Sequence, residues 1–138
     1  MLEKRVRSVV KDVVYCNVLK NPIMDGPSTT FDVVSSTFCL EEACKSQDDL
    51  KMAIKRMAGI LKSNGHLIIA VLMEESSCKL GDDVITCLPI TDEQLKGALR
   101  EAGFVIEKIH TYMPDPTEPT EVEDNDFSHA LFILAKKL

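Results

Sequence analysis

Two glutamates near the ends of two predicted strands are the side chains in this sequence best placed to do chemistry. Glu41 ends a polar segment, 36–41, that follows a short apolar run. Glu75 lies in a second such segment, 71–76, at the end of another apolar run. A carboxylate at such a place can orient a cationic group or accept its proton. Because the carboxyl ends of parallel strands meet at one edge of a sheet, we expect both glutamates at that edge.

A strand–helix–strand unit is expected to position these two segments. The run 31–36 is short and apolar, which is typical of a strand buried on both faces of a parallel sheet, and 67–73 predicts a second strand. Between them, apolar residues recur over 47–62 at the spacing of one buried helical stripe. Ser46 predicts the N-terminal cap of this helix, and the Asn-Gly pair at 64–65 predicts its left-handed end. The three elements together form a right-handed βαβ unit.

Two helices and a further strand are predicted outside this unit. Residues 2–10 have the pattern of the last turns of a helix, and the β-branched residues of 12–18 predict a short strand. Thr91, followed three positions later by Gln94, forms a capping box that begins a helix. Gly103 closes that helix.

The C-terminal part of the chain predicts an antiparallel pair of strands. The apolar runs 104–113 and 127–136 have no helix between them, which favours antiparallel pairing. The connection 114–126 is acidic and contains three prolines, so we interpret it as a loop, either a solvated tip or a lid.

Composition bounds the class of protein. With 138 residues the chain fits one domain, and a net charge of −6 with a pI near 5.0 argues against a general nucleic-acid or anionic-membrane binder. The acidic balance is consistent with a cationic ligand, although solubility alone explains it. No apolar run approaches the length of a membrane span, and the charged N-terminus is unlike a signal peptide.

The cysteines and histidines indicate a reduced chain without a zinc site. The five cysteines are odd in number and contain no C-x-x-C pair, which favours free thiols and a cytoplasmic protein. His66, His110 and His129 are isolated and follow no metal-ligand spacing, so we expect no bound metal.

Four segments carry a resemblance to a known family. They are Ser-Thr-Phe-Cys-Leu-Glu at 36–41, Gly-His-Leu at 65–67, Leu-Met-Glu-Glu-Ser at 72–76 and Thr-Tyr-Met-Pro at 111–114. In order and spacing they are similar to the phenylethanolamine, nicotinamide and indolethylamine N-methyltransferases, which use S-adenosylmethionine. The likeness runs from about Lys4 to the C-terminus and covers the second half of a family member.

The fold implied by the resemblance agrees with the pattern of elements. It is an α/β fold, a Rossmann-like class I methyltransferase sheet that is partial because its first two strands are absent, and it ends in an antiparallel hairpin. Residues 1–138 would then form a single partial methyltransferase domain, its C-terminal half. The implied activity is N-methylation of a small, arylalkylamine-like amine.

The resemblance also implies roles for residues near the substrate. Glu41 and Glu75 match the carboxylates that hold the substrate amine and accept its proton, and Asp126 is a third candidate. Cys78 stands where the family commonly places a tyrosine against the substrate. Val71 stands where the nicotinamide enzyme has an acidic substrate ligand, which speaks against nicotinamide. On the residues alone, Glu41 could instead cap a short turn, and Glu75 could lie in a solvated turn.

The cofactor implied by the resemblance is S-adenosylmethionine. Asn17 and Val18 would follow the third strand of the family's sheet and contact the adenine, with Asn17 in place of the usual aspartate. Thr37, Phe38 and Cys39 would line the wall near the methyl donor. No G-x-G follows any predicted strand, and the glycines occur singly, so we expect the chain alone to bind the cofactor weakly and to be weak or inactive.

Two other readings remain open at this point. The first is a catalytically dead methyltransferase-like module that pairs with a relative and regulates it. It is favoured by the open apolar edge expected at the strand that begins at Phe31. Such an edge also predicts that the isolated chain dimerises, re-pairs its first strand or is part of a longer protein. An unrelated small-ligand α/β domain is the third reading.

Overall fold

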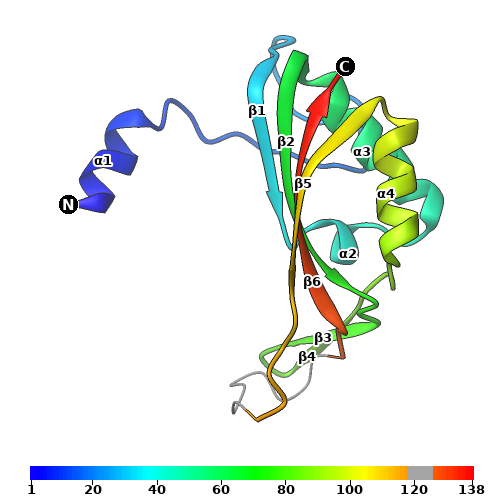
Figure 1. Cartoon of the computed structure of the whole chain (residues 1–138). Coiled ribbons are helices and arrows are strands. Elements are labelled where there is room, and N and C mark those ends of the chain that lie inside the picture. The colour runs from blue at the N-terminus through cyan, green and yellow to red at the C-terminus, as the bar shows by residue number, and fades with distance from the viewer. Residues whose placement is uncertain (118–125) are drawn as a thin grey trace.

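The structure, a computed structural model, describes residues 1–117 and 126–138 and contains a four-stranded sheet with most of the helices on one side and the N-terminal helix apart from them on the other (Figure 1). Most of the predicted acidic loop therefore lies outside the described residues. The elements in chain order are α1 (Leu2–Val9), β1 (Phe31–Thr37), α2 (Leu40–Ala43), α3 (Gln47–Gly59), β2 (Leu61–Met73), β3 (Ser77–Leu80), β4 (Asp83–Thr86), α4 (Asp92–Glu101), β5 (Phe104–Tyr112) and β6 (His129–Lys137).

The sheet has the order β1-β2-β6-β5. β1 and β2 are parallel, as a βαβ unit requires, and the register pairs Val34 with Leu67 and Thr37 with Ala70. β6 lies antiparallel to both β2 and β5, with Ala70 opposite Phe132 and Phe132 opposite His110. The predicted βαβ unit and the predicted antiparallel pair are both confirmed.

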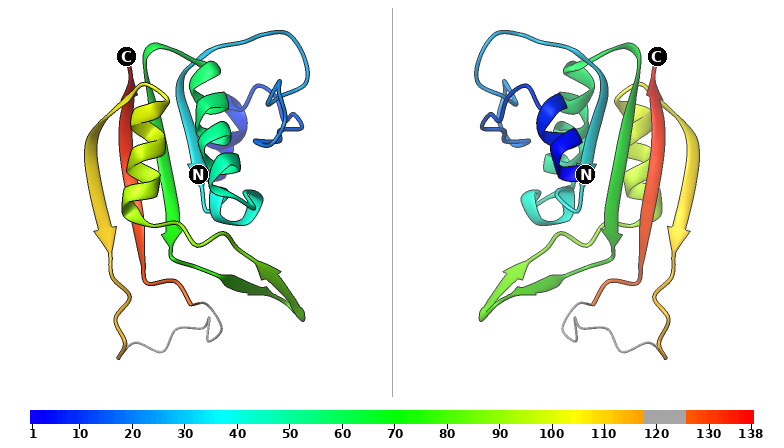
Figure 2. Two further views of the ribbon diagram at one scale, coloured as in Figure 1. Left: turned by 90° about the vertical axis from the view of Figure 1, so that its right-hand side faces the viewer. Right: turned by 90° about the vertical axis from the view of Figure 1, so that its left-hand side faces the viewer.

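Helices α3 and α4 cover one face of the sheet and form the core with it (Figure 2). In α3 the buried positions are Leu50, Ala53, Ile54, Met57 and Ala58, close to the predicted stripe. Ser46 caps the helix by accepting a hydrogen bond from the Asp49 amide at 3.1 Å. The Thr91–Gln94 capping box of α4 is present in both directions, and Gly103 follows the helix at φ +88. None of the helices in the described part of the chain is both long and apolar enough to cross a bilayer.

Two predicted elements are wrong in their details. Residues 12–18 form no strand; only an isolated bridge joins Cys16 to Met24, because β-branched residues do not make a strand without a neighbour to pair with. Helix α3 ends at Gly59, so the predicted stop at 64–65 lies inside β2 instead, where Asn64 has a φ of 64.

Gly65 is needed at this bend for a different reason. A Cβ atom there would lie 2.9 Å from the Lys62 carbonyl oxygen and 3.0 Å from that of Asp32. The absence of a side chain therefore lets the start of β2 approach β1 closely.

The opposite face of the sheet is uncovered among the described residues (Figure 2). Ile68 and Phe132 on this face are 46% and 41% exposed. β1 is also largely exposed, with Val33 at 51%, and has no partner strand on its outer edge in the described part of the chain. The prediction that this strand is buried on both faces is therefore wrong, whereas the predicted open edge is present.

Candidate functional site

Glu41 is placed at the end of the sheet by the turn from β1 into the short helix α2 (Figure 1). Its side chain is 0% exposed. Its Oε1 atom accepts a hydrogen bond from the Leu72 amide at 3.0 Å, and its carbonyl oxygen accepts one from the Leu88 amide at 2.7 Å. The Oε2 atom is buried and has no hydrogen-bond partner among the residues described. Glu41 therefore does more than cap a turn, because it joins α2 to β2 and keeps one acceptor free.

The environment of Glu41 favours the protonated carboxyl. Burial raises its pKa from 4.5 to about 7, the hydrogen bond from Leu72 acts in the opposite direction, and charge on Glu75 and Glu42 adds to the increase. A carboxyl with this pKa is partly ionised at neutral pH, which suits a group that exchanges a proton.

Glu75 follows β2 after Glu74, whose φ of 58 turns the chain at the end of the strand. The Glu75 side chain is 0% exposed, and neither of its carboxylate oxygens has a hydrogen-bond partner in the described part of the chain. Burial raises its pKa, charge on Glu42 and Asp126 acts in the same direction, and the nearby Cys87 thiol opposes it. Glu75 is thus buried rather than part of a solvated turn, and it lies close enough to Glu41 to influence its proton affinity.

Cys78 and Cys87 lie beside Glu75 on the β3–β4 hairpin and the residue that follows it. Both cysteines are buried. The Cys87 amide donates to the Ser76 carbonyl oxygen at 2.8 Å, which brings the end of the hairpin back to the segment that holds Glu75. Burial raises the pKa of both thiols, that of Cys87 to about 12. This triad of Glu75 and two cysteines was not recognisable from the sequence, because no ligand spacing marks it.

Asp126, which precedes β6, binds the segment that follows Glu75. Its Oδ1 accepts hydrogen bonds from the Ser76 and Ser77 amides at 3.0 and 3.3 Å, and its Oδ2 accepts one from the Ser76 hydroxyl. These bonds lower the pKa of Asp126, that of the Ser76 hydroxyl most. In this structure Asp126 orders the segment next to Glu75.

An aromatic pocket lies on the uncovered face of the sheet. It has a volume of about 560 Å³ and is lined by Phe38, Leu72, His110, Tyr112, Phe127, Ala130 and Phe132. Phe38, at φ 50, meets the ring of Phe132 edge to face at 6.4 Å. Leu72 connects the pocket to Glu41, because its side chain lines the pocket while its amide binds the carboxylate. Sequence reasoning missed this pocket, since four separate segments contribute to it.

The residues predicted to contact the cofactor lie in two places. Thr37 is the last residue of β1, and Phe38 and Cys39 follow it at the same end of the sheet as Glu41; burial raises the pKa of the half-buried Cys39 thiol. Asn17 and Val18 lie in the loop before β1. The Asn17 Oδ1 atom accepts a hydrogen bond from the Leu19 amide at 2.9 Å, and Val18 is largely buried.

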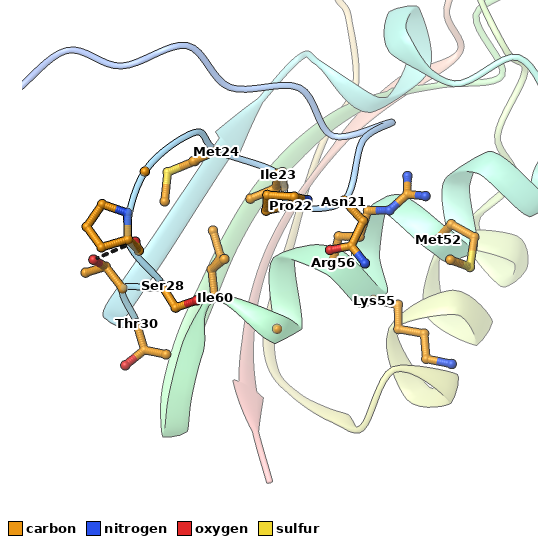
Figure 3. Close-up of a pocket in the computed structure, with 14 residues that line it drawn as sticks. Asn21, Pro22, Ile23, Met24, Ser28, Thr30, Met52, Lys55, Arg56 and Ile60 are labelled. Carbon is orange, nitrogen blue, oxygen red and sulfur yellow. Dashed lines mark hydrogen bonds between the residues drawn. The ribbon is translucent and has the colours of Figure 1, made fainter.

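A second pocket, of about 510 Å³, lies behind that loop and against α3 (Figure 3). Asn21, Pro22 and Ile23 line it from the loop, and Arg56 and Ile60 line it from the helix side. The Arg56 guanidinium donates to the Val18 carbonyl oxygen at 2.9 Å. Arg56 thereby holds the loop that carries Asn17 and Val18, a positioning role that the sequence pattern did not suggest.

Val71, also predicted near the substrate, is a core residue. It is 0% exposed and belongs to the core between the sheet and the helices. A contact between Val71 and a substrate therefore stays a prediction for which the structure offers no opening.

Comparisons with proteins of known sequence bear on this site. The sequence profile of the NNMT/PNMT/TEMT family matches residues 1–138. The chain is 32% identical over 107 residues to the indolethylamine N-methyltransferase of Oryctolagus cuniculus, covering 77% of this chain and 41% of the relative. It is 32% identical over 106 residues to the nicotinamide N-methyltransferase of Homo sapiens, covering 76% and 40%. With the phenylethanolamine N-methyltransferase of Homo sapiens the identity is 27% over 125 residues, covering 88% and 44%. The chain thus spans about two fifths of the length of these relatives.

Solved structures with the same fold include several methyltransferases. A SAM-dependent methyltransferase of Methanosarcina mazei matches with a TM-score of 0.66 at 15% identity, covering 88% of this chain and 65% of that one. The N-methyltransferase NodS of Bradyrhizobium japonicum, in complex with S-adenosyl-L-homocysteine, matches with a TM-score of 0.59 at 12% identity, covering 97% and 58%. At these identities the likeness concerns the fold, which is that of part of a SAM-dependent methyltransferase.

Proposed function

The chain belongs to the NNMT/PNMT/TEMT family, and from this premise we propose that it forms the amine-binding part of an S-adenosylmethionine-dependent N-methyltransferase acting on a small arylalkylamine. The observation that carries the proposal is the buried pair Glu41 and Glu75. Their free acceptors are Oε2 of Glu41 and both oxygens of Glu75. Buried carboxylates without a partner are costly, and a protonated amine supplies both the missing charge and up to three hydrogen-bond donors.

The two glutamates would divide the handling of the amine and its proton. S-adenosylmethionine, when bound, supplies the methyl group as an electrophile on a sulfonium sulfur. The amine nitrogen must be neutral to attack it, so a group on the protein has to remove a proton. Glu75 would orient the ammonium group. Glu41, whose pKa of about 7 leaves it partly ionised at neutral pH, would take up the proton.

The aromatic pocket supports a substrate with a ring at the end of a short alkyl chain. Leu72 places the pocket beside Glu41, and Phe127 is the neighbour of Asp126, which binds the segment next to Glu75. Aromatic side chains contribute burial and ring–ring contacts of about 0.5–1.5 kcal/mol per pair. In the family a tyrosine commonly stands at the position of Cys78 and stacks on the substrate. We expect the aromatic pocket to supply that stacking in this chain.

The residues proposed for the cofactor fit its adenine and methyl-donor sides. The carbonyl oxygen of Asn17 keeps a second lone pair for an adenine amino group, and Val18 offers an apolar wall. Thr37 and Cys39 lie beside Glu41, where a methyl donor would have to meet the amine. The sequence has no Gly-rich turn for the rest of the cofactor, so weak binding by this chain is expected.

Calorimetry with phenylethylamine and its neutral analogue phenylethanol tests the amine site directly. We expect the 138-residue chain to bind the amine and not the alcohol, and Glu75→Gln to weaken amine binding by about tenfold or more, as loss of a buried charge pair predicts. Glu93→Gln is the matched control, because Glu93 is an exposed glutamate on α4, a helix that carries none of the proposed amine ligands. Equal binding of amine and alcohol would refute the proposal.

A transfer assay with labelled S-adenosylmethionine tests the catalytic part of the proposal separately. We expect this chain alone to show little or no transfer to phenylethylamine. Micromolar cofactor binding together with rapid turnover by the 138 residues would contradict the view that it is one part of the enzyme.

A second candidate function, a regulatory module without catalysis, is favoured by the unpaired edge of β1. An edge strand with exposed apolar residues is a ready surface for a second copy or for a relative. Val33, at 51% exposure, lies on this strand. If the edge mediates association, light scattering will show a dimer for the natural chain and a monomer for Val33→Lys. A monomer in both cases excludes the edge as an interface between copies.

A further inference from the structure

Three ligand atoms of metal-binding type meet at the base of the β3–β4 hairpin. A carboxylate oxygen of Glu75 and the sulfurs of Cys78 and Cys87 all lie within 4.8 Å of one another, and all three residues are buried. Neither oxygen of Glu75 has a hydrogen-bond partner in the described ranges. The Cys78 sulfur contacts Glu42 Oε1 at 3.6 Å and the Cys87 sulfur contacts the Ile85 carbonyl oxygen at 3.8 Å, while the two thiols also act on each other and Cys87 acts on Glu75.

We propose that Glu75, Cys78 and Cys87 form a binding site for a thiophilic divalent cation, with Zn²⁺ as the ion that matches it best. Two sulfurs and one carboxylate oxygen are ligands that Zn²⁺ accepts, whereas Mg²⁺ and Ca²⁺ prefer oxygen alone. Glu42, whose Oε1 atom lies 3.6 Å from the Cys78 sulfur, could supply a fourth ligand.

The spacing of the ligand atoms is close to what tetrahedral zinc requires. With a Zn–S distance of about 2.3 Å, two sulfurs on one ion lie about 3.8 Å apart. Because the two sulfurs lie within 4.8 Å of one another, they would have to approach by at most about 1 Å, which side-chain rotation can supply.

The fold holds the three ligands together without help from a metal. Glu75 and Cys78 are three residues apart on the same segment. Cys87 is brought beside them by its amide hydrogen bond to the Ser76 carbonyl oxygen at 2.8 Å and by the β3–β4 pairing, which sets Cys78 opposite Ile85. A preformed set of ligands lowers the ordering cost of binding an ion.

The charges around the site favour a cation. Glu41, Glu42 and Asp126 are the acidic groups that act on this cluster. The nearby ammonium of Lys45 donates to the carbonyl oxygens of Glu42 and Thr86, at 2.9 Å each, and so is directed at main-chain atoms. Binding an ion would release the proton of each thiol, since metal ligands must be thiolates.

A metal ion and an amine would exclude one another, because both require the Glu75 carboxylate. This consequence rests on the proposed function, whereas the proposal of a metal site does not depend on it. Zinc at this place would therefore act as an inhibitor of amine binding rather than as a cofactor of methyl transfer.

Cobalt substitution tests the site on the full chain, reduced and freed of metal by a chelator. Added Co²⁺ is expected to produce the near-ultraviolet absorption of a thiolate-to-cobalt transition, and Zn²⁺ should abolish that absorption. Equilibrium dialysis should find a single zinc ion per chain, with a pH indicator showing proton release on binding. Excess Mg²⁺ should not compete.

Variants decide which thiols are responsible. Cys78→Ser and Cys87→Ser should each weaken zinc binding by at least about tenfold, since even the loss of a group that hydrogen-bonds to a metal ligand commonly lowers metal affinity by that much. Cys16→Ser, which removes an exposed thiol elsewhere, should leave it unchanged. If Cys87→Ser fails to fold by circular dichroism, Cys78→Ser and Glu75→Gln provide the same test. Zinc binding unaffected by Cys78→Ser, or no thiolate absorption with Co²⁺, would overturn the proposal. Amine binding is measured with a chelator present, where no zinc can occupy the site. The amine site and the zinc site are therefore tested independently of one another.

Discussion

The Oε1 atom of Glu41 and the main-chain amide of Leu72 are joined by a hydrogen bond of 3.0 Å, which links the helix after β1 to the end of β2. This bond fixes the carboxyl group in the buried interior while Oε2 stays without a partner among the described residues. Glu41 is therefore both a structural link and a free acceptor. Its two roles make opposite demands on its charge, since burial favours the neutral form and amine binding the ionised one.

Glu41→Gln is expected to raise the free energy of unfolding above neutral pH. Because the folded state raises the pKa of Glu41 from 4.5 to about 7, it holds the proton more tightly than the unfolded chain, and stability falls as pH rises between these values. The full shift corresponds to at most about 3 kcal/mol. Urea unfolding at about pH 5 and pH 8 should show a larger gain for the variant at the higher pH. Glu93→Gln, on an exposed residue of α4, should lack this trend, and an equal gain for Glu41→Gln at both pH values would contradict the explanation.

Gly65→Ala is expected to destabilise the fold by about 1–3 kcal/mol through overpacking. The new methyl group would meet the main-chain oxygens of Lys62 and Asp32 at 2.9 and 3.0 Å, and neither can move without disturbing the β1–β2 pairing. Gly97→Ala is the matched control. No atom lies within 4 Å of its added Cβ in α4, and it should gain about 0.4–1 kcal/mol. Chemical denaturation gives the free energy of unfolding of both variants. Equal free energies of unfolding for Gly65→Ala and the natural chain would contradict this prediction.

Asp126→Asn is expected to loosen the segment that carries Glu75. The Ser76 and Ser77 amides lose a charged acceptor, so their hydrogen exchange should become faster. In the natural chain the same bonds lower the pKa of Asp126, so the protection they give should persist at neutral pH and fade as acid protonates the carboxyl. Asp115→Asn serves as the control, because Asp115 accepts its hydrogen bonds from Thr117 in its own turn, away from Ser76. Unchanged exchange at Ser76 in the Asp126 variant would show that these bonds do not order the segment.

Lys137→Met is expected to cost about 1–3 kcal/mol, the value of hydrogen bonds from a charged donor to buried acceptors. The Lys137 ammonium donates to the carbonyl oxygens of Ala58 at 2.7 Å and Leu61 at 2.8 Å, where α3 ends and β2 begins. It therefore supplies the partners that the last turn of α3 lacks. Thermal unfolding of Lys137→Met is compared with that of Lys136→Met, which removes a charge from the neighbouring residue. Equal losses of stability in the two variants would contradict a specific role of the Lys137 hydrogen bonds.

Periodicity and capping residues predicted most of the fold. The stripe in α3, the capping box at Thr91 and the two C-terminal strands are local signals, and the structure confirms them. The strand predicted over 12–18 failed because β-propensity needs a neighbouring strand to take effect. The stop predicted at 64–65 failed because the same Asn-Gly pair also serves a bend inside a strand.

Only the location of the site, at the edge of the sheet where the parallel strands end, could be predicted from the sequence. Glu41 and Glu75 meet where the parallel strands end, as topology requires. Their complete burial, the aromatic pocket and the cluster with Cys78 depend on contacts between segments far apart in the chain. No pattern of spacing within one segment records such contacts.

The central place of β6 has a consequence for how the nascent chain matures. β6 pairs with β2 on one side and β5 on the other, although it is the last of the described elements to be synthesised. Until His129–Lys137 has left the ribosome, the two older parts of the sheet have nothing to join them, and their apolar edges stay open. Assembly of the sheet therefore waits for β6, and a chain that breaks off before His129 would carry two unjoined parts of the sheet.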